Sequence, residues 1–113
     1  MKAIEIDTQI AKAGQTVRFV QHLDISRNSG MGTRKVRIDI ETDSYKNQGH
    51  CRLDVLDQDG MKWNNVISRP PLTMQTDKDL GYLPDITTRD CKKDFEADKR
   101  YLLTVYEKLM LVA

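Results

Sequence analysis

The chain is poor in cysteine and proline, and it contains no long apolar run. Its two cysteines, Cys51 and Cys91, are too few for a disulfide framework. They could pair with each other, but two cysteines alone are more often free thiols in a reducing compartment, which is what we expect. No apolar segment approaches the roughly 18 residues that a membrane-spanning helix requires. Residues 1–10 include Glu5 and Asp7 and lack the apolar run of a signal peptide. We therefore expect a cytoplasmic protein without membrane association.

An excess of charge of either sign is also missing. The 18 basic and 17 acidic residues leave a net charge of +1, which gives no overall attraction to nucleic acid or to an acidic membrane surface. Any such partner would have to bind a local patch. A chain of 113 residues with 39% hydrophobic and 31% charged residues is typical of one folded domain, here residues 1–113.

Hydrophobic alternation before residue 70 predicts the strands of an antiparallel sheet. It is found in residues 2–7, 16–26, 34–42, 51–55 and 61–67. In the third of these segments Val36, Ile38 and Ile40 point one way and charged side chains point the other, as in a sheet with one buried and one wet face. Residues 8–13 are expected to form a helical turn that ends at Gly14.

A hairpin is predicted around residues 57–60, Asp-Gln-Asp-Gly, because Asp-Gly suits a turn with positive φ. The return strand would place Trp63 in the core as its largest anchor. The prolines that follow Arg69 would end this strand, since proline cannot donate to a ladder.

A helical stripe of apolar residues covers the C-terminal end, from about Thr87, where Thr87 and Asp90 have the form of a capping box. The stripe consists of Cys91, Phe95, Leu102, Val105, Tyr106, Leu109 and Ala113. An alternative is a strand over residues 101–106, because Thr104 and Val105 are β-branched. We favour the helix, since a strand would leave the stripe unexplained.

The predicted fold class is therefore α+β, with an antiparallel meander of about four to five strands and one long amphipathic helix packed on one face. In its core the helix residues Phe95, Leu102, Val105 and Leu109 would meet the sheet residues Val17, Phe19, Val36, Ile38, Ile40, Leu53, Val55 and Trp63.

The loop at residues 27–35 is a candidate binding site for phosphate or nucleic acid. It combines glycines, hydroxyls and cations, which can expose backbone amides beside positive charge. Its spacing matches neither a P-loop nor a dinucleotide fingerprint, and Tyr45 alone supplies a nearby ring. The candidate residues are Arg27, Ser29, Gly30, Gly32, Thr33, Arg34, Lys35 and Arg37. The competing interpretation is a charged loop followed by cross-strand charge pairs on a wet face.

Apolar residues outside the helical stripe suggest self-association. A helix that is apolar around most of its circumference is usually covered on more than one side, and a free sheet edge could serve the same purpose. The helical candidates are Tyr101, Leu103, Leu111 and Val112.

Residues for metal or catalytic chemistry do not assemble in the sequence. His50 and Cys51 are adjacent on a strand and so point to opposite faces, which prevents a joint metal site without a bulge and argues against a nucleophile pair. The acidic turn at residues 54–59 lacks the EF-hand pattern. We expect no metal and no cofactor. An enzyme would need a site built in three dimensions from His22, Asp24 or this acidic turn.

The favoured functional hypothesis is a small non-enzymatic binding or adaptor protein that acts through a protein surface and forms an oligomer, for example a homodimer. The alternative is phosphate or nucleic-acid binding through the loop at residues 27–35.

Overall fold

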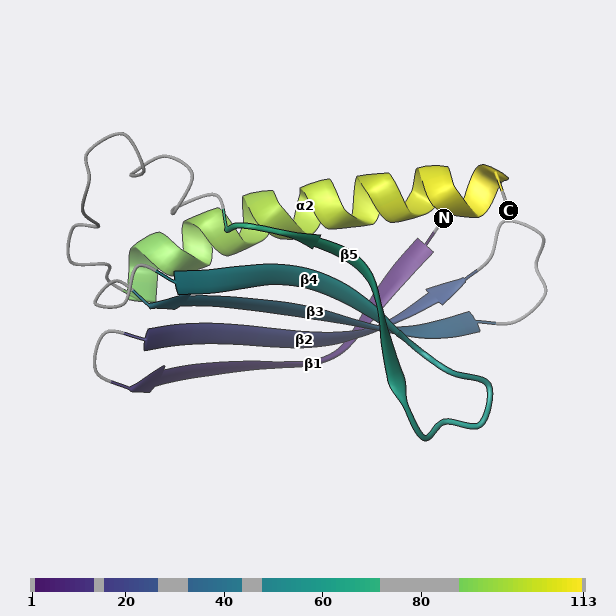
Figure 1. The fold of residues 1–113 in the computed structure, drawn as a ribbon, viewed down its shortest axis with the longest axis horizontal. Helices are drawn as coiled ribbons and strands as arrows, with labels where there is room; N and C mark the ends of the chain where they lie inside the picture. Colours follow the sequence, from purple (N-terminus) through teal and green to yellow (C-terminus); the bar gives the residue numbers. More distant parts are fainter. Residues whose placement is uncertain (1, 14–15, 27–32, 44–47, 72–87, 113) are drawn as a thin grey trace.

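The computed structural model describes residues 2–13, 16–26, 33–43, 48–71 and 88–112. Five strands form one antiparallel sheet in the order β1-β2-β3-β4-β5. They are β1 (Lys2–Ala13), β2 (Thr16–Ser26), β3 (Thr33–Asp43), β4 (Gln48–Leu56) and β5 (Trp63–Arg69). One helix, α2 (Thr88–Val112), follows them and lies across one face of the sheet (Figure 1). The α+β meander expected from the sequence is confirmed.

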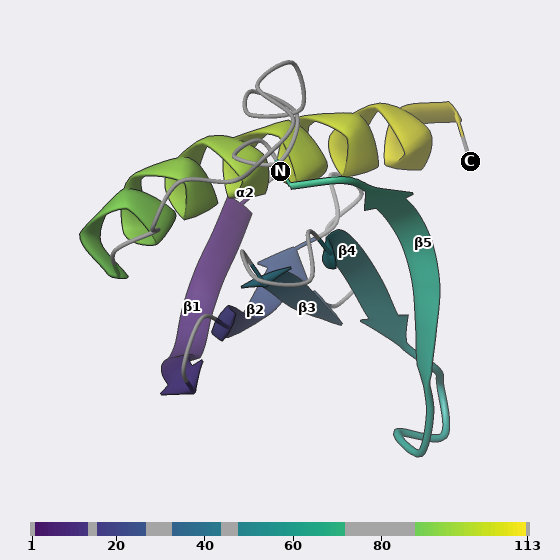
Figure 2. The same ribbon diagram turned by 60° about the vertical axis from the view of Figure 1, so that its left-hand side comes forward.

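The helix packs mainly on the middle of the sheet. It packs on β2, β3 and β4, while β1 and β5 form the two sides (Figure 2). We call the face toward α2 the inner face and the opposite one the outer face. The helix is continuous over residues 101–106, so the alternative strand there is wrong. It begins at Thr88, and Thr87 of the expected capping box lies outside the described residues.

Alternating residues of β2, β3 and β4 build the core on the inner face. Phe19 of β2 stacks on Phe95 of α2 with ring centroids 4.8 Å apart, which fixes the helix to the sheet. The buried apolar residues are Val17, Phe19, Leu23, Ile25, Val36, Ile38, Ile40, Cys51, Leu53, Val55, Phe95, Leu102 and Tyr106. Cys51 is a free thiol.

The helix presents a slightly different face from the one predicted. Leu109 is 47% exposed, and buried Asp98 lies between Phe95 and Leu102 on the inward side. Asp98 accepts a hydrogen bond from Arg69 of β5. The inward side of the helix therefore includes a carboxylate, which the apolar pattern of the sequence does not predict. The expected core position of Leu109 is wrong.

The first strand is longer than predicted. Residues 8–13 continue β1 and pair with β2, so the expected helical turn is wrong. One extra residue, Ile6, lies between the pairs Glu5↔Leu23 and Asp7↔His22. This β-bulge shifts the side-chain alternation by one residue, and it hides the strand period in the sequence.

The hairpin at residues 57–60 is confirmed, but its return strand is shifted. Gly60 has φ of 73°, and its N–H donates to the carbonyl of Asp57 at 3.1 Å. An irregularity in the β4–β5 pairing follows Leu53 and brings Trp63 opposite Leu56, on the outer face. The core position expected for Trp63 is therefore wrong.

Candidate functional site

The outer face carries cross-strand ion pairs. Arg37 of β3 lies opposite Asp54 of β4, and its Nε and Nη2 donate to Oδ2 of Asp54 at 3.1 and 2.8 Å. Asn65 of β5 donates to the other oxygen of Asp54 at 3.0 Å. The predicted charge pairs are thus present, and each oxygen of this buried carboxylate has a donor.

A second carboxylate, Asp39 of β3, is the centre of a larger network. Arg18 donates to both of its oxygens, at 3.0 Å from Nε and 2.7 Å from Nη2. His50 Nε2 lies 2.9 Å and Arg52 Nη2 lies 3.5 Å from the same carboxylate, whose side chain is 0% exposed. Three strands, β2, β3 and β4, are joined through this one residue.

The electrostatics of Asp39 follow from these contacts. Burial acts to raise its pKa, but hydrogen bonds from His50 and Arg18, with the charges of both, outweigh burial and hold the pKa well below its usual value. The same hydrogen bond raises the pKa of Arg18. Asp39 is therefore an anion at neutral pH, and its charge is balanced by Arg18 within the protein.

Trp63 lies on the outer face, beside the pair of Arg37 and Asp54. The guanidinium of Arg37 lies 4.8 Å from the centre of its ring, and the His22 ring lies 5.6 Å away. His22 Nδ1 is 2.7 Å from Asp7 of β1. A cation over an aromatic face is favourable, so Arg37 is held by both Asp54 and Trp63.

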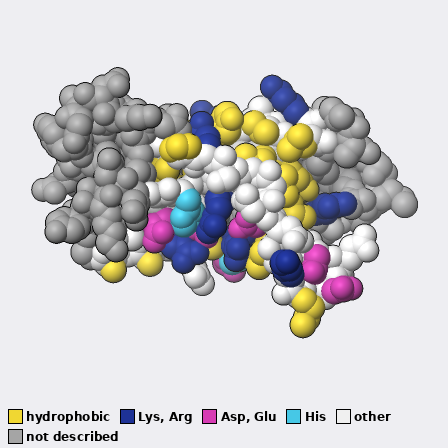
Figure 3. Space-filling model, viewed as in Figure 1, with side chains coloured by type: hydrophobic (Ala, Val, Ile, Leu, Met, Phe, Trp, Pro, Cys, Tyr) yellow, Lys and Arg dark blue, Asp and Glu magenta, His cyan; other side chains and the backbone are white. Residues whose placement is uncertain are grey.

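Among the described residues, the cations predicted to bind phosphate or nucleic acid do not form a cluster of unpaired charges. Thr33 and Arg34 are exposed, whereas Lys35 is 3.3 Å from Asp24 and Arg37 is bound to Asp54. Four of the predicted residues lie outside the described residues: Arg27, Ser29, Gly30 and Gly32. On the face drawn in Figure 3, Lys and Arg side chains alternate with Asp and Glu side chains, with a histidine among them. Such alternation balances charge locally.

The helical candidates for self-association differ among themselves. Tyr101 is 44% exposed, but the guanidinium of Arg69 lies 3.7 Å from the centre of its ring. Leu103 packs partly buried against the core. Leu111 and Val112 belong to α2, but their side chains are outside the described part. The described helix therefore offers Tyr101 and Leu109 as its exposed apolar residues.

The described side chains form no cluster of metal ligands. The part of the chain that the structure describes holds no group of three or more His, Cys, Asp or Glu suited to a metal ion. His50 contacts Asp39 on the outer face while Cys51 is buried on the inner face, as their adjacency predicts. Burial, with Asp98 nearby, raises the pKa of the Cys51 thiol to about 11 despite a hydrogen bond with Arg69, which disfavours the reactive thiolate.

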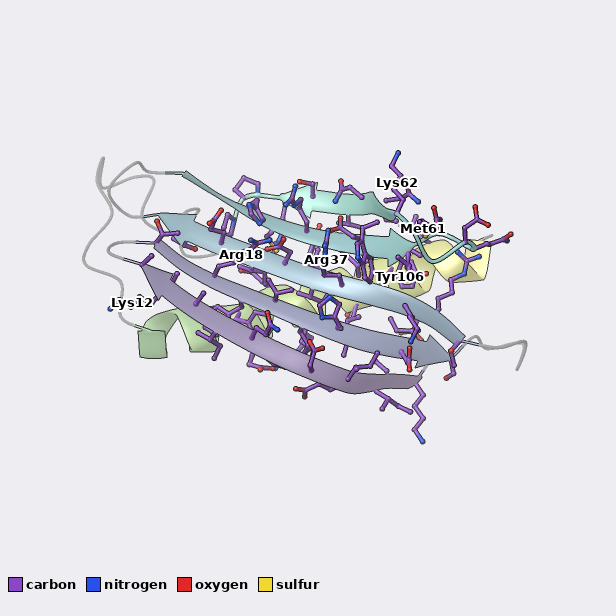
Figure 4. All side chains as sticks on the ribbon, turned by 90° about the horizontal axis from the view of Figure 1, so that it is seen from below. Lys12, Arg18, Arg37, Met61, Lys62 and Tyr106 are labelled. Atoms are coloured by element: carbon purple, nitrogen blue, oxygen red, sulfur yellow. The ribbon has the colours of Figure 1, made fainter. Side chains whose placement is uncertain are left out.

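The strand β1 is the most exposed element of the sheet. All twelve of its residues are exposed, including Ile4, Ile6 and Ile10 at 54%, 50% and 48%. The strand pairs with β2 alone, and it runs along one edge with Lys12 near its end (Figure 4). The sequence indicated a short strand here, but it did not reveal that this strand would be long and open.

The fold and its surfaces define a small α+β protein with a balanced outer face and an open edge strand. No family model matches the chain, and neither the curated proteins nor the solved structures searched contain a match. Within the described residues, α2 is too polar to cross a membrane.

Proposed function

We propose that the protein is a non-enzymatic binding protein that acts through a protein surface, and that this surface is the open edge of β1. The observation that supports the proposal is the exposure of every residue of β1. An edge strand presents a row of backbone N–H and C=O groups that can pair with a strand from another chain.

The exposed isoleucines favour the same surface. Ile4 and Ile10 are about half exposed and lie on opposite faces of the sheet, opposite Asp24 and Phe19 of β2. A strand added beside β1 would cover part of both side chains. Backbone pairing would then supply affinity, and side chains such as these would supply specificity.

The outer face is the weaker candidate. Its buried carboxylates Asp39 and Asp54 already hold Arg18 and Arg37. An anionic ligand would have to compete with these internal partners. Phosphate or nucleic-acid binding through residues 27–35 therefore remains the alternative, and among the cations of β3 only the exposed Arg34 and Lys35 support it, the latter beside Asp24.

A cytoplasmic location is part of the proposal. It rests on the free thiol of Cys51 and on the small number of cysteines, which are typical of proteins in reducing compartments.

Selection of peptides tests the proposal. Amides of a strand point alternately to its two neighbours, so one of the variants Gln9→Pro and Ile10→Pro removes an outward N–H and the other removes a bond to β2. The variant that keeps the wild-type free energy of unfolding is the edge-blocked protein. Peptides that are selected from a random library for binding to the wild-type protein should not bind the edge-blocked protein. Peptides that bind both proteins equally, or an empty selection, would contradict the proposal.

A further inference from the structure

We propose that the strand which adds to β1 is β1 of a second copy of this chain, paired antiparallel about a two-fold axis at Gln9. This inference rests on the proposed function, because it names the partner of the same edge. The evidence is the pattern of charge along β1 and the position of its bulge.

The bulge decides which side chains of β1 share a face. Ala3, Glu5, Thr8, Ile10 and Lys12 lie opposite buried residues of β2 and so belong to the inner face. Ile4, Asp7, Gln9, Ala11 and Ala13 lie opposite outer-face residues. Ile6 is the extra residue between Glu5 and Asp7. In any pairing of two β1 strands, opposed residues must come from the same face.

A two-fold axis at Gln9 meets this condition. In this register Ile6 stays unpaired, as it does in the pairing with β2. Thr8 then lies opposite Ile10, Asp7 opposite Ala11 and Glu5 opposite Lys12 of the second copy. Every one of these pairs shares a face. The symmetry repeats the Glu5–Lys12 pair, so two pairs of opposite charge lie across the interface.

Other two-fold registers near the middle of β1 are less complementary. An axis at Asp7 places two carboxylates directly opposite each other, which is unfavourable. An axis at Thr8 places Glu5 opposite Ile10, and an axis at Ile10 places Lys12 opposite Thr8. The register at Gln9 is the one of these four that sets opposite charges face to face.

The same register also brings apolar surface together. Ile10 is about half exposed on the inner face and lies diagonally beside Ile10 of the second copy, within reach of its side chain. The helix α2 packs mainly on β2, β3 and β4, and every residue of β1 is exposed, so the inner face of β1 is open to this contact. The result would be a continuous ten-stranded sheet with β1 strands at its centre.

Charge reversal tests the pairing. Light scattering on a size-exclusion column, in the low and high micromolar range, should give a dimer of twice the 13.0 kDa chain. Glu5→Lys or Lys12→Glu turns both attractive pairs into repulsive ones and should weaken dimerisation about tenfold or more. The double variant E5K/K12E should restore it. Lys2→Glu, on the same strand but outside the pairs, is the matched control and should leave the dimer unchanged.

Cross-linking tests the register itself. In a background with Cys51 and Cys91 replaced by serine or alanine, Gln9→Cys should form a disulfide-linked dimer under mild oxidation, because the two-fold axis brings the two thiols together. Asp7→Cys and Thr8→Cys should link less readily. If the cysteine-free background is unstable, the charge-reversal variants of the native chain test the pairing instead.

The outcomes separate this inference from the proposed function. A monomer at all concentrations would contradict pairing with a second copy. A dimer whose affinity is unchanged by charge reversal at Glu5 or Lys12 would contradict it as well. Faster linking at Thr8 would overturn the register. Neither result changes the peptide selection, in which loss of binding to the edge-blocked variant would still support β1 as a binding edge.

Discussion

The strands β1 and β3 have similar patterns but opposite surroundings. Both carry isoleucines among charged residues, yet Val36, Ile38 and Ile40 of β3 are at most 4% exposed while Ile4, Ile6 and Ile10 of β1 are about half exposed. The difference is position, because β3 lies between two strands and under α2 whereas β1 pairs with β2 alone. Residue type therefore sets which strands form, and sheet order sets whether an isoleucine stabilises the monomer or remains available to a partner.

Truncation of matched isoleucines should give the largest contrast. Ile38→Ala removes a side chain that is 0% exposed and should lower the free energy of unfolding by about 2–5 kcal/mol. Ile10→Ala on β1 should lower it by less than about 1 kcal/mol. Urea unfolding at low protein concentration measures both without a contribution from dimerisation. Equal losses at the two sites would show that β1 is packed like β3.

Thiol labelling should extend this contrast to reactivity. The pKa of Cys51 is raised to about 11 by burial, with a further contribution from Asp98, so at pH 8 it should react more than about 100-fold more slowly than an ordinary thiol of pKa near 8.5. Ala11→Cys on β1 should react at once. A chromogenic disulfide reagent, with Cys91→Ser in both proteins, reports the two rates. Rapid labelling of Cys51 in the folded protein would argue against the buried inner face.

Disruption of the ion network on the central strands should have the next largest effect on the free energy of unfolding. Asp39→Asn keeps the shape of the side chain but weakens charge-assisted hydrogen bonds from Arg18 and His50, and it should destabilise the protein by about 1–3 kcal/mol. The matched control is Asp24→Asn, because its pair with Lys35 is exposed and should contribute about 0–1 kcal/mol.

The pH dependence of the Asp39 effect has a definite sign. The folded-state pKa lies below its ordinary value, so the stabilisation is complete above the unfolded-state pKa of about 3.9 and is lost as the pH falls toward the folded-state pKa. The difference between the wild type and Asp39→Asn should therefore shrink below about pH 4. A difference that is constant between pH 7 and pH 3 would contradict the lowered pKa of Asp39.

Loss of the ring contact on the outer face should be the smallest effect. Arg37→Lys retains charge near Asp54 but loses the planar group over Trp63, and it should cost about 0.5–1 kcal/mol. Trp63 is the single tryptophan, so its fluorescence reports this site directly. We expect an altered emission in the variant, and an unchanged spectrum would argue against the contact.

The sequence predicted the strands whose two faces differ, and it failed where that difference is absent. Alternation in residues 16–26 and 34–42 and the turn at Gly60 were sufficient, since buried and wet faces alternate there. Residues 8–13 gave no such pattern because both faces of β1 are exposed and Ile6 forms a bulge. The hydrophobic pattern of a segment does not show which strands lie beside it, so it cannot predict an open edge.

The candidate surfaces were less predictable, because they depend on contacts between distant residues. Cross-strand charge pairs on a wet face were expected in general, but the specific pairing of Arg37 with Asp54 was not. The position of Trp63 was not expected either, since the irregularity in the β4–β5 pairing changes its face. Asp98 interrupts the helical stripe because Arg69, far away in the sequence, supplies its partner.

Hydrogen–deuterium exchange at two protein concentrations tests the central claim most directly. At low concentration the amides of residues 2–13 should exchange much faster than those of β3, because half of them point out of the sheet. At high concentration the outward amides of β1 should become protected while β3 is unchanged. Strong protection of β1 that does not depend on concentration would contradict the open edge, and a β1 that stays unprotected at high concentration would contradict pairing with a second copy.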